Sequence, residues 1–225
     1  MYIPYDKLPR IGTEALTIPF VGAIIERLGD SGEKEIIVQT RSKESDPKFS
    51  GTLEIPGGKF RAGESIYQTV RREVLEESGL EITLVGGEDE TLHTSSHDMS
   101  SDIFHPFCVT QSPEGPFVGF IFRCTATGTP ASETNETKGC HWIKVSELKT
   151  VIETNPGRIY TPFLGAYLLE HSDMSFATAV KIILRYYVTA DVILQLNVFE
   201  DYLEKMNPFL FLEVFGKRHK DRKIC

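Results

Sequence analysis

The chain has 225 residues, of which 40% are hydrophobic and 25% are charged. These fractions are those of an ordinary globular protein, so they exclude a disordered or fibrous chain. Acidic residues outnumber basic ones by 32 to 24, and the formal net charge of −8 gives no bulk attraction for nucleic acid or an anionic membrane. We therefore expect no nucleic-acid or membrane partner. A polyanionic substrate would need a local device, such as a metal ion.

Cysteine usage and the N-terminal residues bear on the compartment. Cys108, Cys124, Cys140 and Cys225 include no CxxC pair, which indicates reduced thiols in a cytoplasmic protein, with burial expected for the first three. The chain begins without the basic start and apolar run of a signal peptide, and no stretch approaches the ~20 apolar residues of a membrane span. The sequence therefore predicts a soluble, cytoplasmic protein.

Strands are predicted where apolar and β-branched residues lie between polar turns. The first two should pair as an antiparallel hairpin, because a Gly/Asp/Ser turn joins them. The polar, acidic stretch 86–102 is expected to be a loop. The predicted strands are 15–28, 35–41, 53–55, 81–85, 104–111, 117–126 and 140–145.

Helices are predicted where the apolar spacing and the flanking residues fit. Gly79 should end the first helix, and Ser146 should be the N-cap of the second. The interleaving of strands and helices predicts an α/β or α+β domain over 12–172. A helical C-terminal extension, 173–225, should pack on this domain or on a second subunit, which leaves a homodimer open. The predicted helices are 64–78, 146–154, 162–171, 176–187 and 191–205.

Acidic side chains gather in the segment 57–80, GGKFRAGESIYQTVRREVLEESGL. On a helix, Glu73, Glu76 and Glu77 fall within an arc of about 100° and repel one another at neutral pH. A cation would relieve that repulsion, and Mg²⁺ suits such a cluster because it prefers oxygen ligands and shares them with phosphates. The alternative is a solvated acidic face, as on most glutamate-rich helices. Apolar residues suited to packing on a sheet fill the neighbouring arc: Ile66, Tyr67, Val70, Val74 and Leu75.

The complete spacing of this segment resembles the signature of the Nudix hydrolase family, G-x5-E-x7-R-E-U-x-E-E-x-G-U, where U is apolar. The lead-in Pro56-Gly57-Gly58 is also common in the family. The resemblance implies an α/β/α sandwich with a mixed β-sheet over roughly 150 residues, and it leaves the C-terminal extension unexplained. The signature is matched without a gap or substitution by Gly58, Glu64, Arg72, Glu73, Val74, Glu76, Glu77, Gly79 and Leu80.

The resemblance also implies roles for the matched residues. Glu73, Glu76 and Glu77 would be the principal metal ligands, and Glu64 a more distant carboxylate that acts through water or at a second metal. Arg72 would orient a glutamate through a bidentate pair, and Gly57 and Gly58 would let the backbone turn sharply. The implied metal set is Gly58, Glu64, Glu73, Glu76 and Glu77, and the implied catalytic set is Arg72, Glu73, Glu76, Glu77 and Glu136.

Glu136 enters that set because family members often carry a further carboxylate on a loop before a tryptophan-containing strand. Glu136 lies six residues before Trp142, and Glu133 lies nine before it. Either could be the general base or an additional ligand, and both could be ordinary loop glutamates. We choose Glu136, with Glu73 as the base if neither acts. Trp142 itself is expected to pack in the core.

The activity implied is Mg²⁺-dependent, with Mn²⁺ as a substitute. A pyrophosphohydrolase of this kind cleaves a nucleoside diphosphate linked to another moiety, such as the nucleotide sugar ADP-ribose, by attack of water on phosphorus. The alternative is a non-catalytic Nudix-like module that binds a nucleotide to regulate a partner. The intact signature carboxylates favour the enzyme. The candidates for stacking on the nucleotide base, each also suited to the core, are Phe60, Phe104 and Tyr160. A second metal site could be imagined in the polar stretch that follows the signature, but its spacing fits no zinc pattern. Its residues would be His93, His97, Asp98, Asp102 and His105.

Overall fold

The computed structural model describes residues 5–42, 44, 47–96, 99–111, 116–135, 137–155 and 158. The helices predicted after residue 158 and the proposed boundary at 172/173 lie outside these residues, as does Cys225. Neither described helix is long and apolar enough to cross a membrane.

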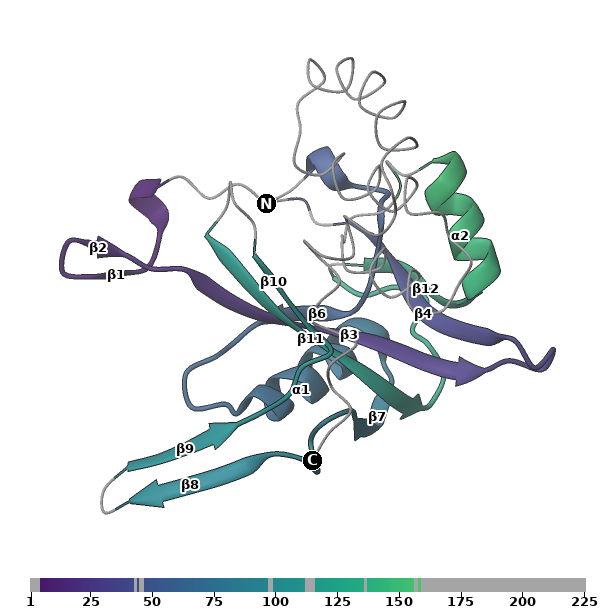
Figure 1. The fold of residues 1–225 in the computed structure, drawn as a ribbon. Helices are drawn as coiled ribbons and strands as arrows, with labels where there is room; N and C mark the ends of the chain where they lie inside the picture. The colour runs from purple at the N-terminus through teal and green to yellow at the C-terminus, as the bar shows by residue number, and fades with distance from the viewer. Residues whose placement is uncertain are drawn as a thin grey trace, which may run out of the picture.

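An eight-stranded mixed sheet forms the centre of the described fold (Figure 1). Its main path runs β10-β11-β3-β4-β12, while β5 pairs with β4, β6 with β3 and β7 with β11. The β3–β11 pair is parallel and the other pairs are antiparallel. The strands are β3 (Ile18–Leu28), β4 (Lys34–Arg41), β5 (Leu53–Glu54), β6 (Gly57–Lys59), β7 (Glu81–Val85), β10 (Cys108–Gln111), β11 (Phe117–Thr127) and β12 (Thr137–Lys144).

Helices α1 (Ile66–Ser78) and α2 (Val145–Thr154) pack on two separate hydrophobic clusters, one on each face of the sheet. Successive side chains of a strand point to opposite faces, so Val21 and Ile25 face α1 while Ile24 faces α2. The predicted α/β/α sandwich with a mixed sheet is therefore confirmed. The predicted hairpin is also present, since β3 and β4 pair antiparallel from Glu26↔Ile36 to Leu28↔Lys34.

Local signals define α1 at both ends. Ser65 caps its N-terminus by accepting a bond from the Gln68 amide, and the Gln68 side chain accepts one from the Ser65 amide in return. Gly79 ends the helix with φ 70°, a left-handed conformation that favours glycine. One packing expectation is wrong, because Leu75 is 52% exposed rather than packed on the sheet.

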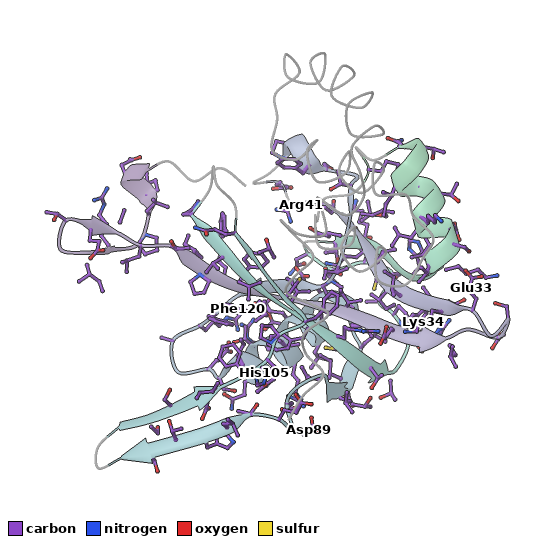
Figure 2. The ribbon with its side chains drawn as sticks, in the orientation of Figure 1. Glu33, Lys34, Arg41, Asp89, His105 and Phe120 are labelled. Atoms are coloured by element: carbon purple, nitrogen blue, oxygen red, sulfur yellow. The ribbon has the colours of Figure 1, made fainter. Side chains whose placement is uncertain are left out.

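The start of α2 differs from the prediction. Ser146 lies in the first turn rather than at the N-cap, which is Lys144 and makes no side-chain cap bond. The Ser146 amide instead donates to the carboxylate of Glu33, 3.1 Å away. The side chain and the backbone amide of Ser146 together lower the pKa of that carboxyl group. Glu33 lies in the β3–β4 turn, directly before the first residue of β4 (Figure 2). A negative charge at the positive end of a helix is stabilising, so a distant loop takes the role of the cap.

The stretch 86–102 is a second difference, because most of it forms a hairpin rather than a loop. Strands β8 (Leu92–Ser96) and β9 (Met99–Ile103) pair antiparallel and project from the body of the domain (Figure 1). Residues 104–107, predicted as strand, precede β10 as irregular backbone. The remaining elements are η1 (Tyr5–Lys7), β1 (Arg10–Ile11), β2 (Glu14–Ala15) and η2 (Pro47–Phe49).

Cys108, Cys124 and Cys140 are free thiols, as expected. Cys124 and Cys140 are buried and Cys108 is half-buried. Burial raises the pKa of Cys124 to about 12 and that of the other two to about 11. A thiol with so high a pKa is a poor nucleophile at neutral pH, so these cysteines serve packing.

Candidate functional site

The two glycines of the signature lead-in lie in strand β6, not in a turn, which corrects the expected reason for them. A Cβ on Gly57 would overlap the carbonyl oxygen of Val21 on the neighbouring strand. A Cβ on Gly58 would overlap the carboxyl group of Glu73. These residues are therefore glycines because backbone and carboxylate approach them closely. Their absent side chains allow α1 to bring its carboxylates against the sheet.

Arg72 lies between three of the four signature carboxylates. Its Nε and Nη2 donate to Glu64 at 2.6 and 2.8 Å, which is the bidentate pair, and its Nη1 donates to Glu73 at 2.6 Å. The same Nη1 lies 3.1 Å from Glu76, one helical turn further on. We call Glu64, Glu73 and Glu76 the outer group. One guanidinium therefore gathers carboxylates that would otherwise repel one another.

Electrostatics at Glu64 follow from this arrangement. The Arg72 guanidinium is the main cause that lowers the pKa of Glu64 to about 2, and a bond from the Thr69 hydroxyl at 3.1 Å adds to it. The same pair raises the pKa of Arg72. Glu64 is therefore ionised throughout the physiological range, which a metal ligand or a water-binding carboxylate requires.

Glu76 is the most exposed of the principal carboxylates, with a side chain 45% accessible. Arg61, from the loop before α1, also reaches it at 3.3 and 3.4 Å, but Arg61 is itself 60% exposed. Exposed pairs of this kind are screened by water and salt and stabilise by ~1 kcal/mol or less. Glu76 is therefore held loosely.

Glu77 stands apart from the outer group, and we call it the inner carboxylate. The residue is only 5% exposed, and its Oε2 accepts bonds from the Gly57 amide at 2.9 Å and from Gln39 Nε2 at 2.8 Å. Gln39 is fully buried on β4. Its other amide atom, Oε1, is buried with no hydrogen-bond partner in the described part of the chain. Two neutral donors thus hold Oε2 of this carboxylate.

A buried ion pair lies on the same strands as Gln39. Arg41 on β4 donates to Glu54 on β5 at 2.9 Å, and both side chains are at most 6% exposed. Glu54 is the cross-strand partner of Gln39 in the β4–β5 register, so these polar groups share the sheet face that α1 covers. Figure 2 labels Arg41 near the end of β4. Sequence reasoning missed Gln39, Arg41 and Glu54, although a glutamine and an arginine inside the run EIIVQTR were a signal.

The loop after β11 returns to the C-terminal end of α1. The Ala131 amide donates to the carbonyl of Ser78 at 2.8 Å, and the Thr137 hydroxyl donates to the carbonyl of Glu77 at 3.2 Å. Glu133 on this loop is exposed and lies 3.5 Å from Lys138. Glu136 lies outside the described residues.

The chemistry of the donor set fits a hard divalent cation. The four signature carboxylates offer only oxygen atoms, and with Arg61 and Arg72 they leave two formal negative charges. Within the described ranges, however, no three acidic, histidine or cysteine side chains already stand at metal-binding separations. The reason is visible in the contacts, since the outer group turns toward Arg72. A cation would therefore share these carboxylates with the arginine.

Phe60 and Phe104, the described candidates for stacking on the nucleotide base, pack against the hydrophobic core beside α1. Phe60 stacks on Phe120 with centroids 6.0 Å apart, and Phe104 meets the same ring edge-on at 5.8 Å. Trp142 is half-buried against this core, as expected, and Arg27 lies 4.1 Å above its ring. Tyr160 lies outside the described residues.

The histidine-rich stretch considered as a second metal site is divided between the β8–β9 hairpin and the segment after it. His93 pairs with Asp102 across the hairpin at 2.7 Å, and both side chains are exposed. His97 and Asp98 lie outside the described residues. The described pair is thus an exposed cross-strand hydrogen bond. His105 lies in the irregular segment after β9 rather than on the hairpin (Figure 2).

Comparison with known proteins identifies the same family as the signature does. Residues 19–162 match the family model of the NUDIX domain. No curated protein matches the chain. Among solved structures, a NUDIX hydrolase from Nitrosomonas europaea has 17% sequence identity and a TM-score of 0.48, over 70% of this chain and 73% of that one.

Two further solved structures are similar at comparable levels. The MutT NUDIX hydrolase from Burkholderia pseudomallei has 18% identity and a TM-score of 0.40, over 58% of this chain and 84% of that one. The NUDIX domain of Shewanella oneidensis NrtR, solved with ADP ribose, has 16% identity and a TM-score of 0.46, over 65% of this chain and 84% of that one. Because the family match spans more than half of this chain and includes the whole signature, the chain belongs to the Nudix family and is a Nudix hydrolase.

Proposed function

We propose that this hydrolase is a pyrophosphohydrolase that cleaves a nucleoside diphosphate linked to another moiety, a nucleotide sugar such as ADP-ribose being one example. The supporting observation is the arrangement of four carboxylates around the β6–α1 junction, three gathered by Arg72 and one anchored in a buried position. The acidic chain carries no excess of basic residues that could hold a pyrophosphate by itself.

The residues that would hold the metal are Glu73, Glu76 and Glu77, with Glu64 as a more distant ligand and Gly58 at the edge of the site. Mg²⁺ or Mn²⁺, when bound, supplies charge neutralisation at the pyrophosphate oxygens and makes a water more acidic. The protein's own part is positional: Gln39 and Gly57 fix Glu77, and Arg72 keeps Glu64 ionised.

The proton of the attacking water would pass to Glu136. Residues on both sides of it in sequence, Ala131 and Thr137, bond to the C-terminal end of α1, which supports this choice. A loop carboxylate can also move away to release product. If Glu136 is not the base, Glu133 and Glu73 are the remaining candidates.

A screen of nucleoside diphosphate derivatives with Mg²⁺ tests the proposal. Released phosphate is measured after coupling to a phosphatase, and the products show which bond was cleaved. EDTA should abolish turnover, and added Mg²⁺ or Mn²⁺ should restore it, because the site offers carboxylates rather than cations to the substrate. Undiminished turnover in EDTA would contradict the metal-dependent mechanism.

A further inference from the structure

Gln39 contacts a signature carboxylate without being part of the family signature. It lies on β4, 38 residues before Glu77 in sequence, and is 0% exposed. Its Nε2 donates to Glu77 Oε2 at 2.8 Å, while its Oε1 is buried with no hydrogen-bond partner among the described residues. This orientation of the amide is the one that the contact requires, because the reverse would place two oxygen atoms together.

Packing alone does not explain a glutamine at this position. A buried amide oxygen without a partner is destabilising, and an apolar side chain of similar size would avoid that cost. The neighbouring residues of β4 that face the cores, Ile36, Ile37 and Val38, are indeed apolar. The amide is therefore retained for its donor group, and that group contacts a signature carboxylate.

We propose that Gln39 is a positioning residue that fixes the carboxylate of Glu77 for metal binding. This inference rests on the proposed function, in which Glu77 is a ligand. Gln39 and the Gly57 amide both donate to Oε2, so together they set the rotation of the carboxyl group. Because the donor is neutral, it orients Glu77 without competing with the cation by charge, unlike Arg72 in the outer group.

The test is Mn²⁺ binding to the full-length, metal-free protein, followed by electron paramagnetic resonance, so that the readout does not require turnover. Gln39→Met removes the donor but keeps the volume. Loss of a residue that orients a metal ligand weakens metal affinity about 10- to 100-fold, and we expect a weakening of that size. The matched control is Thr40→Val, the next residue on β4, whose side chain points to the opposite face; its affinity should remain that of the wild type.

A second variant, Gln39→Asn, keeps the amide but shortens its reach, so it should also weaken Mn²⁺ binding. It provides the test if Gln39→Met does not fold. Combining Gln39→Met with Glu77→Gln should weaken binding by no more than about twofold beyond Glu77→Gln alone, because the two residues act through one contact. Wild-type Mn²⁺ affinity in the folded Gln39 variants, with weakened affinity in Glu77→Gln, would overturn the inference. Wild-type affinity and turnover in Glu77→Gln would instead overturn the proposed role of Glu77.

Discussion

The inner carboxylate and the outer group are four members of one signature held in two different ways. Glu77 is buried and accepts bonds from a backbone amide and a neutral side chain. Glu64, Glu73 and Glu76 are more exposed and are gathered by one arginine. A hydrogen bond to a charged group typically contributes about 1.5–3 kcal/mol, whereas an exposed ion pair such as Arg61–Glu76 contributes ~1 kcal/mol or less.

The difference teaches that the sequence motif alone does not make the carboxylates equivalent. The inner carboxylate has its position fixed before any ligand arrives. The outer group can exchange part of its contact with Arg72 for a contact with a cation, because both partners are positively charged. We therefore expect the inner position to be the more sensitive to substitution.

The largest effect should come from Glu77→Gln. The substitution removes the charge of the fixed carboxylate, while the amide oxygen of the new side chain can still accept the bonds from Gln39 and Gly57. We expect turnover to fall about a thousandfold, equivalent to roughly 4 kcal/mol of activation free energy. Glu76→Gln is the matched comparison and should lose less, since Glu76 is 45% exposed and loosely held. Equal losses in the two steady-state assays would remove the distinction between inner and outer positions.

Arg72→Lys should have the next largest effect. Lysine keeps the charge, but it cannot make the bidentate pair with Glu64 while also contacting Glu73. Turnover should fall about 10- to 100-fold, as for other residues that orient metal ligands. The melting temperature of the metal-free protein should also fall, because the outer group then repels itself. Arg61→Lys, which alters an exposed contact to Glu76, is the control and should lose less. Wild-type turnover in Arg72→Lys would show that Arg72 contributes charge alone.

Parts of this site could be predicted from the sequence because their causes are local. The signature places its carboxylates by helical spacing, and Ser65, Gln68 and Gly79 define α1 by capping bonds within a few residues. The two runs of apolar and β-branched residues, with a Gly/Asp/Ser turn between them, likewise predicted the paired strands β3 and β4. In these segments, neighbouring residues supply both the pattern and the contacts.

Other parts depend on contacts between distant segments, which a single sequence does not display. Gln39 reaches Glu77 only because β4 lies under α1, and Glu33 caps α2 across 113 residues. The β8–β9 hairpin was missed for a different reason. Its strands are mostly Thr, Ser, His and Asp, so they lack the apolar alternation that marks a strand packed on a core.

The proposed base, Glu136, lies in sequence between Ala131 and Thr137, which bond to Ser78 and Glu77. Glu136→Gln should lower the maximal rate at least about tenfold more than Glu133→Gln does, the low end of what general base catalysis contributes. Glu133 is exposed and lies near Lys138, so its loss should be small. Rates measured across a Mg²⁺ titration should show that Glu136→Gln changes the Mg²⁺ affinity less than Glu77→Gln does. Equal, small losses would place the base on α1, at Glu73.

The smallest effect is expected in the stability of the outer group at acid pH. The pKa of Glu64 is lowered from 4.5 to about 2, chiefly by Arg72. A lowered pKa in the folded state stabilises the protein above pH 4.5, and the contribution is lost as the pH falls from 4.5 toward 2.

The measurement is the free energy of unfolding in EDTA across that range, for the wild type and for Glu64→Gln. Their difference should be constant at neutral pH and should shrink as the solution is acidified. Glu33, whose pKa is also lowered, contributes to both proteins and cancels in the difference. Introducing Arg72→Lys into both should flatten the dependence, because it removes the main cause of the shift. Parallel curves for the wild type and Glu64→Gln would show that Arg72 does not hold Glu64 in solution, and the outer group would then be looser still than the inner carboxylate.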